Sequence, residues 1–227
     1  MRSRGNLLKF WRVKFKLESL NKCIESLKEE SSLRKMFQPK MIHGLFLPKK
    51  FFVTHGAATS SVSVLNAFDA ALVKAGIAQC NLVNVSSILP PDAELTESVP
   101  ITPGTITFTV LARMDGAPGE TIGAGIGWAW GRSASGEKYG FVAEAHGYKD
   151  RQAIERELKW KLKEMAEIRG MKLEKIEVMS EFMEVPKGRY GCVIVALVYV
   201  PWTGVEAGRE LEERTPTLQK TFPSKLP

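Results

Sequence analysis

The sequence is short of the side chains that build metal and redox sites. Its 227 residues include only three cysteines and three histidines. Cys23, Cys80 and Cys192 lie far apart, so they form neither a C-x-x-C site nor a disulfide framework, and we expect a reducing, cytoplasmic setting. No two histidines have the H-x-H or H-E-x-x-H spacing of a zinc site. We therefore expect no metal cofactor.

The motifs of several common enzyme and membrane classes are also absent. There is no G-x-S-x-G, the strand-to-helix elbow of many serine hydrolases. The stretch GETIGAGIGWAWG is not a nucleotide-binding G-x-G-x-x-G loop, because Trp128 stands three residues after Gly125 and the pattern is that of a strand. Glycines within a strand favour close backbone approach instead. No uncharged apolar run of about 18 residues exists, which argues against a membrane span.

The positive charge is concentrated at the N-terminus. The net charge is +7, and residues 1–40 alone hold eleven Lys and Arg against four Glu. Residues 41–227 contain 21 basic and 21 acidic side chains. Binding to nucleic acid by release of counterions needs clustered cations, and this larger part has no net excess of them. We therefore expect no nucleic-acid partner.

Composition divides the chain into three parts. Residues 1–40 form a basic amphipathic extension, which either contacts an anionic surface or a partner or is poorly ordered, and we expect the second. Met41 stands directly before the first strand pattern, so either Met1 or Met41 is the true start. Residues 203–227 are a charged tail. Residues 41–202 are left as one domain.

Hydrophobic periodicity in this domain predicts strands and two helices. Gly76 ends the first helix, Asp150 caps the second and Gly170 ends it. The order of elements predicts an α+β fold in which two sheets pack together with the helices outside. The expected strands are 50–55, 81–87, 105–113, 121–130, 139–146, 175–183 and 192–200, and the expected helices are 63–75 and 150–169.

A pair of serines ends one of these strands, in the segment NLVNVSSILPPDAE. The hydroxyl of Ser87 can attack the carbonyl carbon of Ser86 through a five-membered ring and give an ester. Amide resonance opposes this attack, so the fold has to twist the bond and place hydrogen-bond donors on the developing oxyanion. The ester can then eliminate to dehydroalanine, which hydrolyses to a pyruvoyl group at the new chain end.

Four segments closely resemble the pyruvoyl-dependent arginine decarboxylases: LNAFDAALVKAGIAQCNLVNVSSILPPDAE, PGETIGAGIGWAW, YGFVAEAHG and GCVIVALVYVPW. The likeness extends over about residues 50–202 and makes residues 41–202 the decarboxylase domain. It implies a four-layer α-β-β-α sandwich of mainly antiparallel sheets, assembled as a homotrimer. It also implies cleavage between Ser86 and Ser87, which gives a β chain and a pyruvoyl-bearing α chain.

The resemblance further implies the reaction and its residues. L-Arginine would become agmatine and carbon dioxide through a Schiff base with the pyruvoyl group, which replaces pyridoxal phosphate, and agmatine would supply polyamine biosynthesis. Glu144 matches the proton donor, and Asn81 matches the asparagine that assists self-processing. Asp69 matches the acid that receives the guanidinium group.

Each of these residues also has an ordinary explanation as a polar surface side chain. Their joint occurrence at the family's positions favours the functional interpretation. Two alternatives stay open. One keeps the fold and the cleavage but changes the amino-acid substrate, and the other is an uncleaved, noncatalytic subunit.

Overall fold

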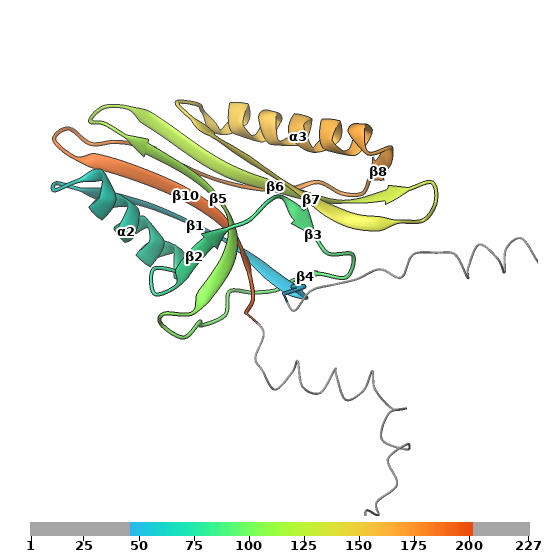
Figure 1. Ribbon diagram of the computed structural model, residues 1–227. Helices are drawn as coiled ribbons and strands as arrows, with labels where there is room; N and C mark the ends of the chain where they lie inside the picture. The colour runs from blue at the N-terminus through green and yellow to red at the C-terminus, as the bar shows by residue number, and fades with distance from the viewer. Residues whose placement is uncertain (1–45, 202–227) are drawn as a thin grey trace, which may run out of the picture. The chain divides into compact units, whose positions relative to one another are not determined.

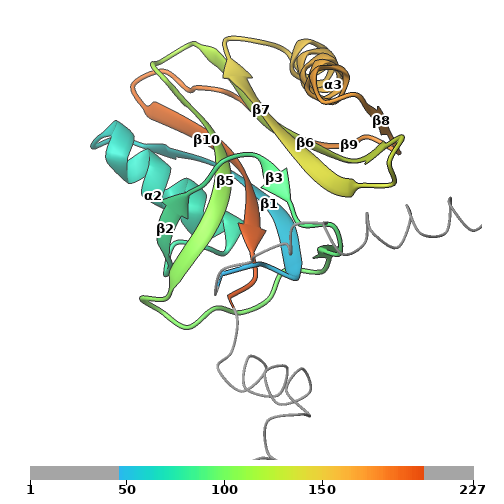
Figure 2. The same ribbon diagram turned by 45° about the vertical axis from the view of Figure 1, so that its right-hand side comes forward.

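The computed structural model describes residues 46–201, so the predictions made for residues 1–40 and 203–227 lie outside the described residues. The described residues form two sheets packed face to face, with one helix on each outer face (Figures 1 and 2). This arrangement confirms the α+β sandwich of four layers.

The first sheet has the strand order β2-β5-β10-β1-β4. Strand β10 lies at its centre and pairs antiparallel with both β1 and β5. Its side chains are buried on both faces, because α2 covers one face and the second sheet covers the other. Burial on both faces fits the unbroken apolar run of residues 192–199, and the strand expected over 192–200 is confirmed. The bounds are β1 Lys50–Ser60, β2 Asn81–Asn84, β4 Glu94–Leu95, β5 Ile106–Gly116 and β10 Tyr190–Tyr199.

The second sheet is antiparallel throughout its described pairs. Its strand order is β3-β7-β6-β8, and β9 also pairs with β6. Strand β3 is so short that it pairs with β7 only at Gly140 and Phe141, which leaves the rest of that edge of β7 without a strand neighbour among the described residues. The bounds are β3 Ile88–Leu89, β6 Thr121–Ser133, β7 Lys138–Gly147, β8 Met171–Leu173 and β9 Glu177–Glu184.

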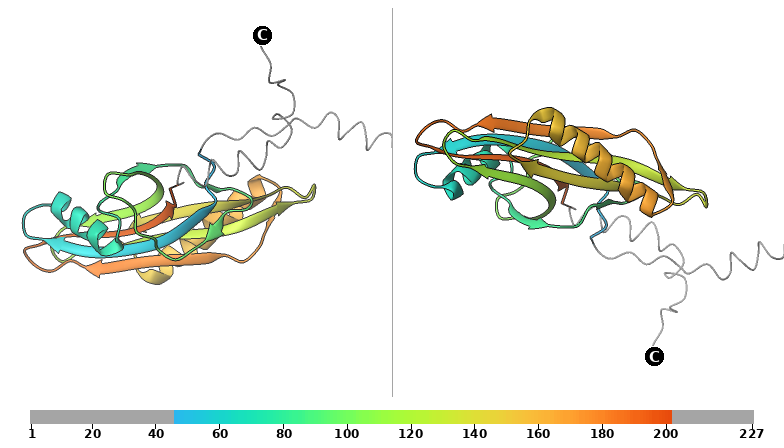
Figure 3. Two further views of the ribbon diagram at one scale, coloured as in Figure 1. Left: turned by 90° about the horizontal axis from the view of Figure 1, so that it is seen from below. Right: turned by 90° about the horizontal axis from the view of Figure 1, so that it is seen from above.

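Helices α2 and α3 lie on opposite outer faces of the sandwich (Figure 3). Helix α2, Val64–Ala75, covers the first sheet and ends at Gly76, whose φ of 75° is left-handed. Helix α3, Arg151–Ile168, covers the second sheet, and the carboxylate of Asp150 accepts the hydrogen bond of the Ala153 amide at 2.7 Å. The predicted caps at Gly76 and Asp150 are confirmed, and Gly170, with a φ of 60°, directly follows the last cap residue of α3, Arg169.

The glycines of β6 let α3 approach its sheet closely. A Cβ atom added to Gly125 would lie 2.7 Å from a methyl carbon of Ile154, and one added to Gly127 would lie 3.1 Å from a methyl carbon of Leu162. The expectation that these glycines mark a close approach is confirmed. Their effect is to bring the side chains of α3 within reach of the neighbouring strand β7.

Some elements differ from the predictions. The first strand was expected to end at His55, but β1 continues to Ser60 because its ladder with β10 runs from Phe51 to Ser60. Strands β3, β4 and β8 were not predicted. Each has two or three residues, which is too few for a periodic pattern.

The chain changes from one sheet to the other between β2 and β3 (Figure 1). The Val85 amide still donates to the Thr109 carbonyl of the first sheet, at 3.0 Å. The Ser87 carbonyl already accepts from the Val142 amide of the second sheet, at 2.9 Å. The crossover between the sheets is therefore the Ser86–Ser87 pair, and we call these two residues the crossover.

Candidate active site

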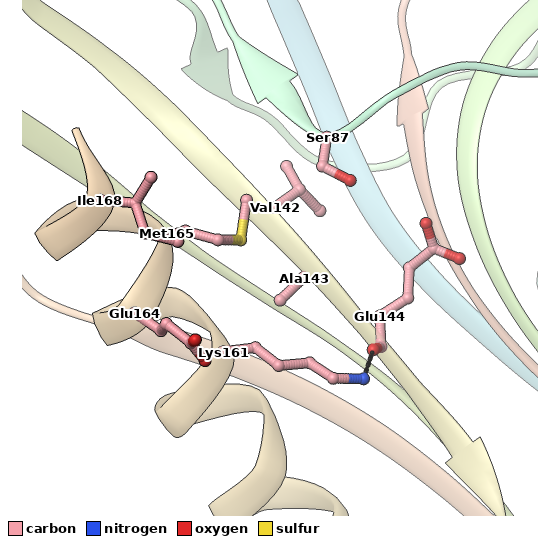
Figure 4. Close-up of a pocket in the computed structure, with 8 residues that line it drawn as sticks. All are labelled: Ser87, Val142, Ala143, Glu144, Lys161, Glu164, Met165 and Ile168. Carbon is pink, nitrogen blue, oxygen red and sulfur yellow. Dashed lines mark hydrogen bonds between the residues drawn. The ribbon is translucent and has the colours of Figure 1, made fainter.

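A cavity of about 290 Å³ lies beside the crossover. Three elements form its walls: the crossover itself, the middle of β7 and the second half of α3 (Figure 4). Most of the lining is apolar, with a few polar groups among it, which is the usual composition of a small-molecule site. The lining residues are Ser87, Val142, Ala143, Glu144, Lys161, Glu164, Met165 and Ile168.

Hydrogen bonds hold the chain on both sides of the Ser86–Ser87 bond. The Val142 amide donates to the Ser87 carbonyl at 2.9 Å, and the Tyr199 hydroxyl donates to the Ile88 carbonyl at 2.9 Å. Burial raises the pKa of Tyr199 to about 12, so this hydroxyl keeps its proton and remains a donor. The Ile88 amide donates to the Ser86 carbonyl at 3.1 Å. The carbonyl that Ser87 would attack thus already has a hydrogen-bond donor.

The backbone of the crossover has no left-handed strain. Among the described residues, every positive φ belongs to a glycine. Ester formation needs a twisted bond and donors on the developing oxyanion, and the structure shows one such donor. Support for bond cleavage therefore comes from the amide of Ile88.

Glu144 lies in β7, and its carboxyl is on the same side of that strand as the Ser87 hydroxyl (Figure 4). The side chain is half-buried. Burial raises the pKa of the Glu144 carboxyl, and the positive charges of His146 and Lys161 oppose this rise to a smaller extent. The structure therefore brings together Ser87 and Glu144, two of the residues predicted from the sequence, and favours the protonated form of the acid.

Lys161 was not predicted. Its ammonium group donates to the backbone carbonyl of Glu144 at 2.8 Å and forms an ion pair with Glu157 at 2.7 Å. The only signal in the sequence was the i, i+4 spacing of Glu157 and Lys161, which is common on exposed helix faces. Glu164, Met165 and Ile168 complete the helical wall of the cavity.

Asp69 does not line this cavity. It is exposed on α2. Helix α2 covers the outer face of the first sheet, so both sheets lie between α2 and α3 (Figure 2). One helical turn away on either side, Leu65 and Val73 are also exposed, at 69% and 62%. Within one chain, Asp69 therefore belongs to an apolar outer surface and not to the site of Ser87.

Asn81 also lies away from the cavity. It is the first residue of β2, and the strand carries the chain about 3.3 Å per residue towards the crossover. Its side-chain amide donates to the Gly104 carbonyl at 2.9 Å, and its backbone amide donates to the Thr105 carbonyl. Within one chain, Asn81 therefore holds the loop before β5 by hydrogen bonds.

Neither a metal cluster nor a membrane helix is found in residues 46–201. No group of three His, Cys, Asp or Glu side chains in this part of the chain could hold a metal ion. No helix of the same residues is long and apolar enough to cross a membrane.

Comparison with known proteins gives one consistent result. The family model for pyruvoyl-dependent arginine decarboxylase matches residues 50–203. A curated protein of that name from Methanopyrus kandleri is 34% identical over 156 residues, which are 67% of this chain and 97% of that protein. Those from Pyrococcus abyssi and Thermoplasma volcanium are 34% and 33% identical, over 68% and 73% of this chain and 97% of each relative.

The raised pKa of Glu144 predicts a pH-dependent effect on stability. An acid whose pKa rises on folding costs stability once the pH exceeds its unfolded value, because the folded state resists ionisation. Glu144→Gln should therefore unfold at the same temperature as the wild type near pH 4 and a few degrees higher at pH 8. Thermal melts across this range test the effect. Glu137→Gln, at an exposed turn, is the control, and an equal gain there would contradict the assignment.

Proposed function

The chain belongs to the pyruvoyl-dependent arginine decarboxylase family, and from this membership we propose that it converts L-arginine to agmatine and carbon dioxide. The pyruvoyl group would form from Ser87 when the chain cleaves itself between Ser86 and Ser87. The observation that carries the proposal is the shared cavity of Ser87 and Glu144 at the crossover. Agmatine would then supply polyamine biosynthesis.

The cleavage needs a nucleophile, an attacked carbonyl and a donor for the oxyanion, and Ser87, Ser86 and Ile88 supply them in that order. The Ser87 hydroxyl oxygen forms a bond to the Ser86 carbonyl carbon, and the bond from that carbon to the Ser87 nitrogen breaks. The amide of Ile88 stabilises the negative charge on the Ser86 oxygen. Elimination then releases the Ser86 carboxylate, and water replaces the nitrogen as ammonia, which leaves the ketone.

The residues around Ser87 fit a pyruvoyl group. Val142 holds the carbonyl of residue 87 at the second sheet, and Ala143, Met165 and Ile168 give the cavity apolar walls. A terminal pyruvoyl group supplies an electrophilic carbonyl that acts as an electron sink in decarboxylation. Apolar walls favour loss of a charged carboxylate as neutral carbon dioxide, because they solvate the charged form poorly.

Glu144 is the proton donor in this proposal. After carbon dioxide leaves, the substrate carbon needs a proton, and burial shifts the Glu144 carboxyl towards the protonated form that can donate one. Its position beside Ser87 in the same cavity supports this role.

We propose that the protein acts as a homotrimer in which neighbouring subunits complete each site. The number three rests on the resemblance to the family. The shared site is supported by the exposed Leu65 and Val73 on either side of Asp69, since apolar side chains of this size at a helix surface favour a protein partner. A neighbouring subunit would bring its Asp69 and Asn81 to the cavity of Ser87.

Cleavage predicts two polypeptides that stay associated. The β chain, residues 1–86, includes β1, and the ten-residue ladder of β1 with β10 holds it to the α chain. Purified protein should therefore elute as one complex but give two bands on a denaturing gel, with an α chain blocked at its N-terminus. Ser87→Ala should abolish both cleavage and release of carbon dioxide. Ser86→Ala keeps the attacking hydroxyl and should still cleave; the opposite pattern would refute the assignment of the nucleophile.

If the carboxylate of Asp69 binds the guanidinium group of the substrate, the enzyme should prefer arginine. Release of carbon dioxide should be measured from arginine, lysine, ornithine, histidine and aspartate. The wild type should favour arginine, and Asp69→Ala should lower kcat/KM for arginine about tenfold or more, since a charged partner of the guanidinium is lost. Glu137→Ala is the control. A wild type that prefers another amino acid would support the alternative substrate and not arginine.

Sharing of the site between subunits predicts complementation. Asp69→Ala and Glu144→Gln chains should each have little activity alone. Co-expressed chains should regain activity up to about a quarter of the wild-type sites by random mixing, because one chain supplies Glu144 and its neighbour supplies Asp69. Activity that stays at the level of the separate variants would show that each chain uses only its own residues.

A further inference from the structure

Within residues 46–201, the end of β7 that carries Glu144 lacks a strand neighbour on the side of the crossover. The Val142 amide points to that side, because it donates to the Ser87 carbonyl. Backbone groups two residues farther along an antiparallel strand point the same way, so the carbonyl of Glu144 also faces this open edge. Pairing with β3 covers only Gly140 and Phe141. The Glu144 carbonyl therefore needs a donor from outside the sheet.

Lys161 supplies this donor from α3. Its ammonium group lies 2.8 Å from the Glu144 carbonyl oxygen (Figure 4). The same group is held by Glu157 at 2.7 Å, and the other oxygen of Glu157 accepts from the Lys149 ammonium at 2.6 Å. These two hydrogen bonds lower the pKa of Glu157, so it remains ionised. Lys161 is thus fixed between a carboxylate on its own helix and the backbone of β7.

The charge of Lys161 also acts on the carboxyl of Glu144. His146 on β7 also acts on that carboxyl, and Glu164 on α3 lines the same cavity. On β6, the residue opposite is Ile126, and β5 faces the gap between the sheets with apolar side chains, including Val110 and Ala112. Lys161 and His146 are the positive groups that limit the rise in the pKa of Glu144.

We propose that Lys161 is a positioning residue: its hydrogen bond to the Glu144 carbonyl fixes the open edge of β7 and aims the Glu144 carboxyl at the cavity of Ser87. The role rests on the proposed function only in taking Glu144 as the proton donor. The contact itself, and its effect on the Glu144 carboxyl, exist in the folded chain whatever the substrate.

The test compares Lys161→Met with Lys163→Met in the full-length chain. Lys163 is exposed on the same helix, with no hydrogen bond or ion pair in the described part of the chain. Lys161→Met should cleave normally, because Lys161 does not contact the Ser86–Ser87 bond. Its kcat for arginine should fall roughly 10- to 100-fold with KM changed less than about twofold, as expected when a supporting residue is lost. Lys161→Arg should restore part of kcat, and Lys163→Met should match the wild type.

The pH profile separates positioning from general stability. Glu144 has to be protonated to donate, so kcat falls as the pH rises through its pKa. Loss of the Lys161 charge raises that pKa, so the descending limb should move to higher pH in Lys161→Met. An unchanged limb with only a lower melting temperature would overturn the proposal, as would an equal loss of kcat in Lys163→Met.

A stability measurement, which does not depend on catalysis, tests the effect of Lys161 separately from the proposed function. The gain in melting temperature from Glu144→Gln should be larger in the Lys161→Met background, and should level off at higher pH, because the folded pKa of Glu144 is higher there. An equal gain in both backgrounds would overturn the proposed effect of Lys161. Failure of the wild type to release carbon dioxide from arginine would refute the proposed function, and the stability experiment would still decide on Lys161.

Discussion

The site depends on one constraint: a single chain crosses between two packed sheets over two residues. The Val85 amide is bound in the first sheet and the Ser87 carbonyl in the second, so only the Ser86–Ser87 pair is left to make the crossing. Because each sheet fixes its own end, the chain has little freedom at the bond that we propose to break. The same constraint places the Ser87 side chain at the edge of β7, where Glu144 lies.

The layers of the sandwich explain why this edge of β7 is accessible to a ligand and yet partly buried. Glycines in β6 bring α3 close to the second sheet, and α3 then supplies one wall of the cavity. The short strand β3 leaves the edge of β7 open beyond Phe141, so Glu144 is half-buried and not enclosed. Partial burial is what raises the pKa of its carboxyl while leaving room for a ligand beside it.

In the proposed function, the position of Asp69 makes substrate binding depend on assembly of the subunits. An acid on the outer face of α2 cannot reach the cavity of its own chain through two sheets. In a homotrimer it would meet a neighbour's cavity, so the specificity for a guanidinium group would exist only in the assembled protein. Such a dependence would couple activity to assembly, since separated subunits would keep Ser87 and Glu144 but lose the substrate's binding partner.

The sequence by itself determined the local features. The caps at Gly76 and Asp150, the buried strand β10, the glycine approach in β6 and the α+β class follow from patterns that act over a few neighbouring residues. Tertiary structure alone decided which residues meet. Ser87 and Glu144 line one cavity, Lys161 contacts the Glu144 backbone, and Asp69 and Asn81 lie away from that cavity. These positions depend on strand register and on the packing of layers, which bring together residues far apart in the chain.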